Sequence, residues 1–97
     1  MQQHSVQKIG SLLNDYLRES GLEKPLLEHR VVEKWPDFMG PMVARLTRKV
    51  ELKNGVLYVH ISSAALKAQL FECRRELVIK LNESVGGNVV DDVRLLG

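Results

Sequence analysis

"VELKNGVLYVHISSAALKAQL", residues 50–70, decides the fold of this chain. Two short runs of alternating apolar residues meet at Asn54-Gly55, a pair that favours a two-residue type I′ turn because both positions of that turn need a positive φ. The turn fixes the register of a β-hairpin in which Lys49 faces His60 and Lys53 faces Val56. One face of the hairpin is apolar and is predicted to belong to the core. It consists of Val50, Leu52, Leu57, Val59 and Ile61.

The opposite face of this hairpin is polar. It consists of Lys49, Glu51, Lys53, Val56, Tyr58 and His60. Cations beside rings that can stack on bases are typical of a nucleic-acid surface. Glu51 in the middle argues against that reading, and lysine and tyrosine are also common on any solvated sheet face. At this point the face is either a binding surface or only the wet side of a sheet.

A long helix and a final strand are predicted after the hairpin. Ser62 or Ser63 is predicted to cap one long helix that ends at Gly86-Gly87, and "NVVDDVRLL" at 88–96 reads as a final strand. The buried stripe of that helix is Leu66, Leu70, Cys73, Leu77, Leu81 and Val85.

Upstream of the hairpin, the apolar spacing predicts one helix within residues 5–20 and a second from Pro25 that ends before Pro36. A short helical turn is expected at 42–47. The fold class is therefore α+β in the order α-α-β-β-α-β, with a small three-stranded sheet. The helices are expected to pack on one face of the sheet and to leave the other open.

Composition indicates an ordinary globular chain. The 97 residues are 44% hydrophobic and 27% charged, and the apolar runs are too short to span a bilayer. The first ten residues lack the apolar stretch of a secretory signal, and the lone Cys73 has no partner for an internal disulfide. We expect a cytoplasmic, single-domain protein.

Charge is distributed unevenly along the chain. The net charge is only +2, but residues 1–44 carry five Lys/Arg against six Asp/Glu, whereas residues 45–80 carry eight against three. The second stretch therefore has a net charge of +5. Such an asymmetry favours an anionic partner, although a solvated face can also carry it.

The chemistry-bearing residues do not form a catalytic or metal-binding pattern. His4, His29 and His60 belong to three different predicted elements and show no ligand spacing. Cys73 falls in an apolar stripe, and adjacent strand residues such as Asp91 and Asp92 point to opposite faces. Since no glycine-rich phosphate loop occurs either, we expect no enzyme, no metal, no cofactor and no small-molecule substrate.

Binding is the better class of function. On the long predicted helix, Lys67, Phe71, Arg74 and Val78 share one flank, where they either bind a partner or extend the buried stripe with the cations at its rim. The predicted nucleic-acid-binding residues are Arg45, Arg48, Lys49, Lys53, Tyr58, His60, Lys67, Arg74 and Arg75. Trp35 and Phe38 are the candidates for contact with a protein partner, although an aromatic residue before a proline often packs in the core.

Several stretches resemble the DciA-like family, long catalogued as a bacterial domain of unknown function. They are "WPDFMG" at 35–40, "NGVLYVHISS" at 54–63, "QLFECRRELVIKLNESVG" at 69–86 and "VVDDVRL" at 89–95. The resemblance implies a K-homology-like fold and a role in DNA replication, in which the protein assists loading of the replicative helicase and binds that helicase and DNA. It implies one domain over 1–97, with an N-terminal helix at 1–24 and a K-homology-like core at 25–97. The basic hairpin and the long helix would form the DNA side.

Three departures from the family pattern bear on these expectations. The G-x-x-G clamp of nucleic-acid-binding K-homology domains does not occur, so binding would rest on cations and stacking. Longer members carry a tail after the last strand, whereas this chain stops at Gly97, so the folded domain itself would meet the helicase. The Trp that often begins the long helix is replaced within "SSAALKAQL". The expected partners are single-stranded or forked DNA and the replicative helicase; the alternatives are a protein-interaction module and an RNA- or ribosome-associated domain.

Overall fold

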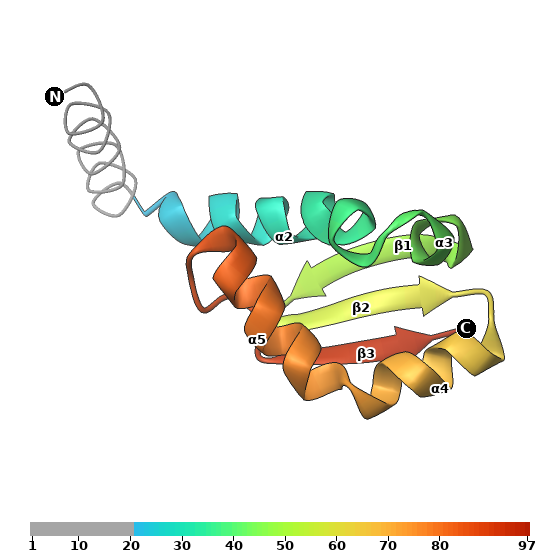
Figure 1. Ribbon diagram of the computed structural model, residues 1–97. Helices are drawn as coiled ribbons and strands as arrows, with labels where there is room; N and C mark the ends of the chain where they lie inside the picture. Colours follow the sequence, from blue (N-terminus) through green and yellow to red (C-terminus); the bar gives the residue numbers. More distant parts are fainter. Residues whose placement is uncertain (1–20) are drawn as a thin grey trace, which may run out of the picture.

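The computed structural model describes residues 21–97, which form three strands and four helices (Figure 1). In chain order these are α2 (Glu23–Met39), α3 (Pro41–Leu46), β1 (Thr47–Lys53), β2 (Val56–Ile61), α4 (Ala64–Glu72), α5 (Arg74–Val85) and β3 (Asp92–Leu96). The α+β class is confirmed, since a three-stranded sheet carries packed helices. The helix predicted within residues 5–20 lies outside the described residues.

The sheet has the order β1-β2-β3, with β1 antiparallel and β3 parallel to the central strand β2. The predicted hairpin register is confirmed from the Lys49–His60 pair to the Lys53–Val56 pair. Asn54 and Gly55 both have a positive φ, of 51° and 80°, as the tight turn requires. The register shifts between Thr47 and Lys49, so Arg48 is the extra residue of a bulge at the start of β1.

The hairpin turn is docked onto the chain just before β3. The backbone amides of Asp91 and Asp92 donate to the Gly55 carbonyl, at 2.6 and 3.3 Å. A Cβ on Gly55 would collide with the Asp91 carboxylate. Gly55 is therefore required both by its positive φ and by this close approach, and the turn ties the hairpin to the third strand.

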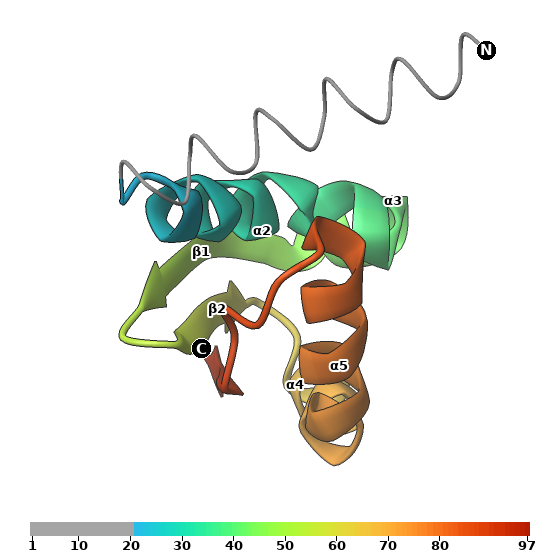
Figure 2. The same ribbon diagram turned by 90° about the vertical axis from the view of Figure 1, so that its left-hand side faces the viewer.

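The core lies on one face of the sheet. Leu57, Val59 and Ile61 alternate with half-buried residues along β2, and all three are at most 1% exposed. Val31 and Trp35 of α2 and Leu81 of α5 are fully buried against them. Figure 2 shows α2 and α5 on the same side of the sheet. No described element covers the other side, which we call the open face.

The single long helix predicted after the hairpin is wrong. The chain leaves the helical conformation at Cys73, with φ −104° and ψ 19°, so that α4 and α5 meet at an angle (Figure 1). A straight helix from Ala64 to Val85 would be about 33 Å long, whereas a five-residue strand such as β3 spans about 17 Å. The break lets α4 stay against β2 and β3 while α5 turns to pack on β3 and α2. Neither glycine nor proline marks the position, so no local signal predicted it.

The predicted bounds of α2 also need correction. The helix begins at Glu23, two residues before Pro25, and runs through Pro36 to Met39. Proline lacks the N–H that would bond one turn back, but the following turn closes with a 2.9 Å bond from the Gly40 amide to the Pro36 carbonyl. The "PDFMG" segment therefore ends a helix at Gly40 rather than breaking it at Pro36.

Asn82 of α5 positions the approach to β3. Its Oδ1 accepts from the amides of Val89 and Val90, at 3.1 and 2.9 Å, and its Nδ2 donates to the Val90 carbonyl at 2.9 Å. One side chain thus satisfies three backbone groups of a segment that has no regular structure. Val89 and Val90 are held in the core in this way, and the chain enters β3 in a fixed place.

Candidate nucleic-acid interface

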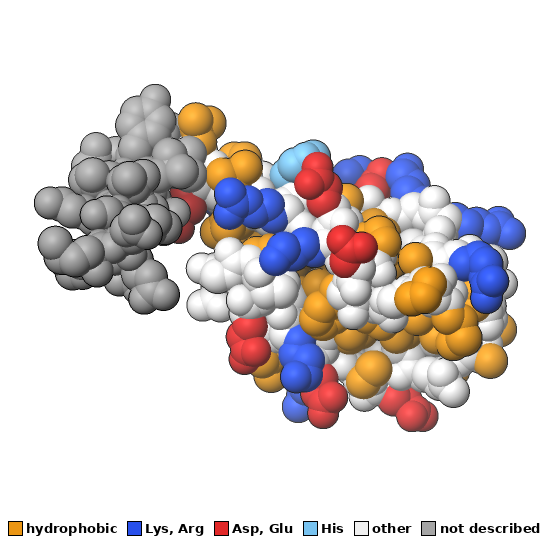
Figure 3. All heavy atoms as spheres, turned by 45° about the horizontal axis from the view of Figure 1, so that its top comes forward, with side chains coloured by type: hydrophobic (Ala, Val, Ile, Leu, Met, Phe, Trp, Pro, Cys, Tyr) orange, Lys and Arg blue, Asp and Glu red, His pale blue; other side chains and the backbone are white. Residues whose placement is uncertain are grey.

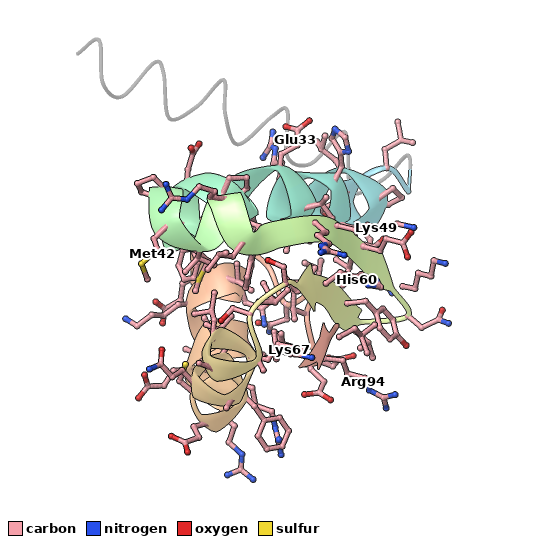
Figure 4. All side chains as sticks on the ribbon, turned by 90° about the vertical axis from the view of Figure 1, so that its right-hand side faces the viewer. Glu33, Met42, Lys49, His60, Lys67 and Arg94 are labelled. Atoms are coloured by element: carbon pink, nitrogen blue, oxygen red, sulfur yellow. The ribbon has the colours of Figure 1, made fainter. Side chains whose placement is uncertain are left out.

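The open face brings together side chains from all three strands. They are Lys49, Glu51 and Lys53 from β1, Val56, Tyr58 and His60 from β2, and Asp92, Arg94 and Leu96 from β3. The register places Glu51, Tyr58 and Arg94 in one row across the sheet. Figure 4 shows Lys49, His60 and Arg94 projecting from the three strands toward the same side. Arg94 was not predicted, because the pairing of β3 with β2 is non-local.

Glu51 forms ion pairs with both lysines of the hairpin. The Lys49 ammonium lies 2.7 Å from one oxygen of its carboxylate, and the Lys53 ammonium lies 3.6 Å from the other. The hydrogen bond from Lys49 lowers the pKa of Glu51, and the charge of Lys53 lowers it further. The predicted lysines are therefore on the open face, but each already has a counter-ion there.

A second candidate region lies where α4 meets α5, at residues 71–75, which we call the elbow. The guanidinium carbon of Arg74 lies 4.2 Å from the centroid of the Phe71 ring, within the range of a cation–π contact. Phe71 is 57% exposed, so neither partner is sequestered in the core. Arg75 follows on the first turn of α5 and is exposed. Among the described contacts, no carboxylate is paired with Arg74 or Arg75.

A groove separates the elbow from β3. Its first part is a hollow of about 360 Å³, lined by Phe71, Arg74 and the strand residues 92–96. A second hollow of about 390 Å³ adjoins it, since both are lined by Arg74 and Asp92. We call the two hollows together the β3 groove. Because β3 is the last strand in the sheet order, its outer edge has no strand neighbour among residues 21–97. Arg74 from the elbow and Arg94 from the strand both line the first hollow.

The remaining predicted cations lie elsewhere. Lys67 is half-buried on α4, and its ammonium reaches the end of β3, so close that a Cβ on Gly97 would lie 2.6 Å from it (Figure 4). Because the helix breaks at Cys73, Lys67 and Arg74 do not share the straight flank that the sequence predicts. Arg45 lies in the last turn of α3, and Arg48 lies in the bulge of β1, the strand at the opposite edge of the sheet from β3.

The prediction that Trp35 contacts a partner is corrected. Trp35 is 0% exposed, and its indole nitrogen donates to the Thr47 hydroxyl at 3.1 Å. That hydroxyl in turn donates to the Val43 carbonyl at 2.7 Å, which ties α2, α3 and β1 together. The ring is a core residue with a satisfied polar atom. Phe38 is half-buried against the core, and its contact with a partner stays a prediction.

The helix-covered side of the molecule is more hydrophobic in appearance than the open face. In Figure 3 hydrophobic side chains gather on this side, and Lys and Arg are scattered around them. Met42 of α3 is 60% exposed. No group of three or more His, Cys, Asp or Glu side chains within residues 21–97 is arranged to hold a metal ion. None of the helices in that range is both long and apolar enough to cross a membrane.

Comparison with known proteins gives a family and several relatives. Residues 8–95 match the family described as "Dna[CI] antecedent, DciA". A UPF0232 protein of Mycobacterium leprae (strain TN) is 31% identical over 91 residues, which cover 94% of this chain and 48% of the relative. A UPF0232 protein of Corynebacterium glutamicum (strain R) is 26% identical over 92 residues, covering 95% of this chain and 52% of the relative. The chain thus spans about half the length of the curated relatives it matches.

Proposed function

The chain belongs to the DciA family, and from this premise we propose that it is a non-enzymatic accessory protein of DNA replication. In this role it binds single-stranded or forked DNA and assists the replicative helicase. The family match supports the role in replication. The arrangement of cations and rings on the described residues supports DNA as a partner.

The observation that carries the DNA contact is the β3 groove. Phe71 offers a ring face and Arg74 a cation on one wall, and Arg94 lines the same hollow from the strand. A single strand can place a base on an aromatic ring, and such stacking contributes about 1–3 kcal/mol per base. Its phosphates can then meet the two arginines. In a duplex the bases are already stacked and paired, so this mode of contact favours single strands.

The groove also accounts for binding without a G-x-x-G clamp. Guanidinium groups bind phosphate in a planar, often bidentate geometry, and Arg74 and Arg75 are the first two residues of α5. The hairpin lysines contribute less to this proposal, because Glu51 already holds them. The DNA side thus moves from the hairpin toward the elbow.

The decisive measurement is a salt titration of a labelled single-stranded oligonucleotide. We expect binding at ~50 mM salt and a steep loss of affinity as salt rises, as counter-ion release requires. Replacing Arg74 by Ala should reduce the log–log slope by about 0.7, the value for one phosphate contact with a single strand. Arg30→Ala on the exposed side of α2 is the matched control and should leave the slope unchanged. Absence of binding at ~50 mM salt would contradict the DNA role.

A second candidate function is a protein-interaction module that contacts the helicase without binding DNA. It is favoured by Glu51, which pairs with both hairpin lysines and offsets part of their charge, and by Asp92, which lines the β3 groove. The exposed Met42 and the half-buried Phe38 are the apolar candidates for such a contact. Capture of the purified helicase by a chain that binds no oligonucleotide would select this function. Matched RNA and DNA strands test the RNA alternative, since a reader of the 2′-hydroxyl prefers RNA.

A further inference from the structure

We propose that Glu51 determines strand selectivity, by keeping the hairpin lysines of the open face away from the phosphates of duplex DNA. This inference rests on the proposed function, because it assumes that the chain meets DNA at all. It assigns to the open face a role opposite to the one that its lysines suggest. The groove selects single strands, and Glu51 prevents the flat side of the sheet from binding any polyanion that approaches it.

The geometry of the carboxylate carries the first step. Glu51 stands between Lys49 and Lys53 on β1, on the same face as both. Its two oxygens are divided between them, one 2.7 Å from Lys49 and the other 3.6 Å from Lys53. A phosphate that binds either lysine must displace a carboxylate already in place. It must also approach the negative charge of that carboxylate, which remains on the face after displacement.

The shape of the two candidate regions carries the second step. The β3 groove is hollowed and lies beside the outer edge of β3, which has no strand neighbour within residues 21–97. The open face is a sheet surface with its side chains standing out from it. A duplex can lie on a sheet surface and contact it through phosphates alone. Sequence-independent phosphate contacts supply essentially all of non-specific binding. A cationic open face would therefore add duplex affinity without adding selectivity.

The electrostatic state of Glu51 agrees with this role. The neighbouring ammonium groups lower the pKa of its carboxyl, so it stays ionised at neutral pH. A specificity difference can be built from an element that repels the wrong partner as well as from one that attracts the right partner. Glu51 is such an element, since removing its charge frees two lysines in one change.

The test compares Glu51→Gln with Glu33→Gln. Glu33 is an exposed residue of α2 that pairs with His29 at 2.5 Å, away from the hairpin, and its replacement gives the same change in net charge (Figure 4). Each variant is titrated with a labelled duplex and a labelled single strand of the same length. Two freed lysines should steepen the duplex salt slope by up to about 1.8, or 0.9 for each phosphate contact. Lowering salt from ~200 to ~50 mM should then raise duplex affinity about tenfold more for E51Q than for the wild type.

Single-strand affinity should rise less than duplex affinity in E51Q, so the preference for single strands falls. Glu33→Gln should match the wild type on both probes. Adding Lys49→Ala and Lys53→Ala to E51Q should remove the gain. Thermal unfolding checks that each variant is folded, and Glu51→Thr, a neutral residue suited to a strand, replaces E51Q if that variant is not.

Three results would overturn the proposal: equal duplex affinities for E51Q and E33Q, a gain that survives loss of both lysines, or a gain confined to the single strand. These are distinct from failure of the proposed function. A wild type that binds no single strand, beside an E51Q that binds duplex, refutes the groove and supports only the part of the proposal in which Glu51 keeps the hairpin lysines away from duplex phosphates. A wild type that binds single strands, beside an E51Q that behaves like E33Q, supports the groove and refutes the role of Glu51. No binding by any variant refutes both.

Discussion

The hairpin and the elbow both place cations beside aromatic rings, but the cations differ in their neighbours. On the hairpin, Lys49 and Lys53 share a carboxylate that stands between them on the same strand. At the elbow, Arg74 lies over a ring and lines a hollow, with no carboxylate paired to it among the described contacts. Counting cations favours neither region. What each cation already touches decides which of them is available to a phosphate.

The largest effect is expected from a change that disturbs the contact between the hairpin turn and the segment before β3. Gly55→Ala places a Cβ against the Asp91 carboxylate at a φ of +80°. The left-handed conformation costs about 1–2 kcal/mol for a residue with a Cβ, and overpacking adds about 1–3 kcal/mol. We expect a loss of about 3 kcal/mol in the free energy of unfolding, measured by urea denaturation.

Gly86→Ala is the matched control for that measurement. Its φ is +74°, but nothing lies within 4 Å of the added Cβ, so only the conformational cost applies. The difference between the two variants measures how tightly the hairpin turn is docked before β3. If the two lose equal stability, the Asp91 side chain moves aside at no cost and does not hold the turn closely.

The second change weakens only the attachment of the segment that leads into β3, the strand that lines the β3 groove. Asn82→Ala removes three hydrogen bonds to Val89 and Val90 and leaves their backbone groups without a protein partner. A buried polar group left unpaired costs about 1–3 kcal/mol, so we expect a loss of about 2 kcal/mol in the same denaturation experiment. Hydrogen exchange should rise in β3 before it rises in the hairpin. Asn88→Ala, at an exposed position in the same loop, should cost little stability. Equal losses for the two variants would show that the hydrogen bonds of Asn82 to Val89 and Val90 are not needed.

The third change sharpens the comparison without unfolding either region. Phe71→Ala removes an exposed ring from the elbow, so stability should hardly change while single-strand affinity falls about tenfold, the lower part of the range for one stacked base. Tyr58→Ala on the open face should reduce affinity less. Met42→Ala, an equally exposed apolar residue on α3, should leave binding unchanged. A larger loss for Tyr58→Ala than for Phe71→Ala, measured by fluorescence anisotropy, would return the DNA side to the hairpin.

The smallest effect expected is a pH dependence confined to the hairpin. The Glu51 pKa is lowered in the folded state, so its pairing stabilises the fold above the unfolded value, here 4.5, and is lost as pH falls through the folded pKa. Between pH 6 and pH 3 the wild type should therefore lose slightly more thermal stability than E51Q. High salt should shrink this difference, because Lys49 is largely exposed and Glu51 is partly exposed. An E51Q profile parallel to that of the wild type would show that the pair is not stabilising.

The hairpin and the elbow also differ in how much of their structure could be predicted from the sequence. The hairpin register, the core face and the α+β class follow from alternation and from Asn54-Gly55, because those signals act between neighbours in the chain. The elbow, the position of Arg94 and the hydrogen bonds of Asn82 to Val89 and Val90 depend on how distant segments meet. Cys73 is neither Gly nor Pro, and the pairing of Arg94 with Tyr58 joins strands separated by two helices. The sequence left Trp35 open between contact with a partner and a place in the core, and its helical spacing from Val31 agrees with the core position that it takes.

The parallel pairing of β3 has a consequence for how the protein is made. The hairpin closes through its own turn, and such local structures form within microseconds once their residues are free. The middle strand gains its second neighbour only when residues 92–96 emerge, after α4 and α5. Until then β2 has a bare edge, and the valines at 89, 90 and 93 are missing from the core. During synthesis the chain should therefore pass through a stage with an incomplete sheet, which is the stage most exposed to aggregation.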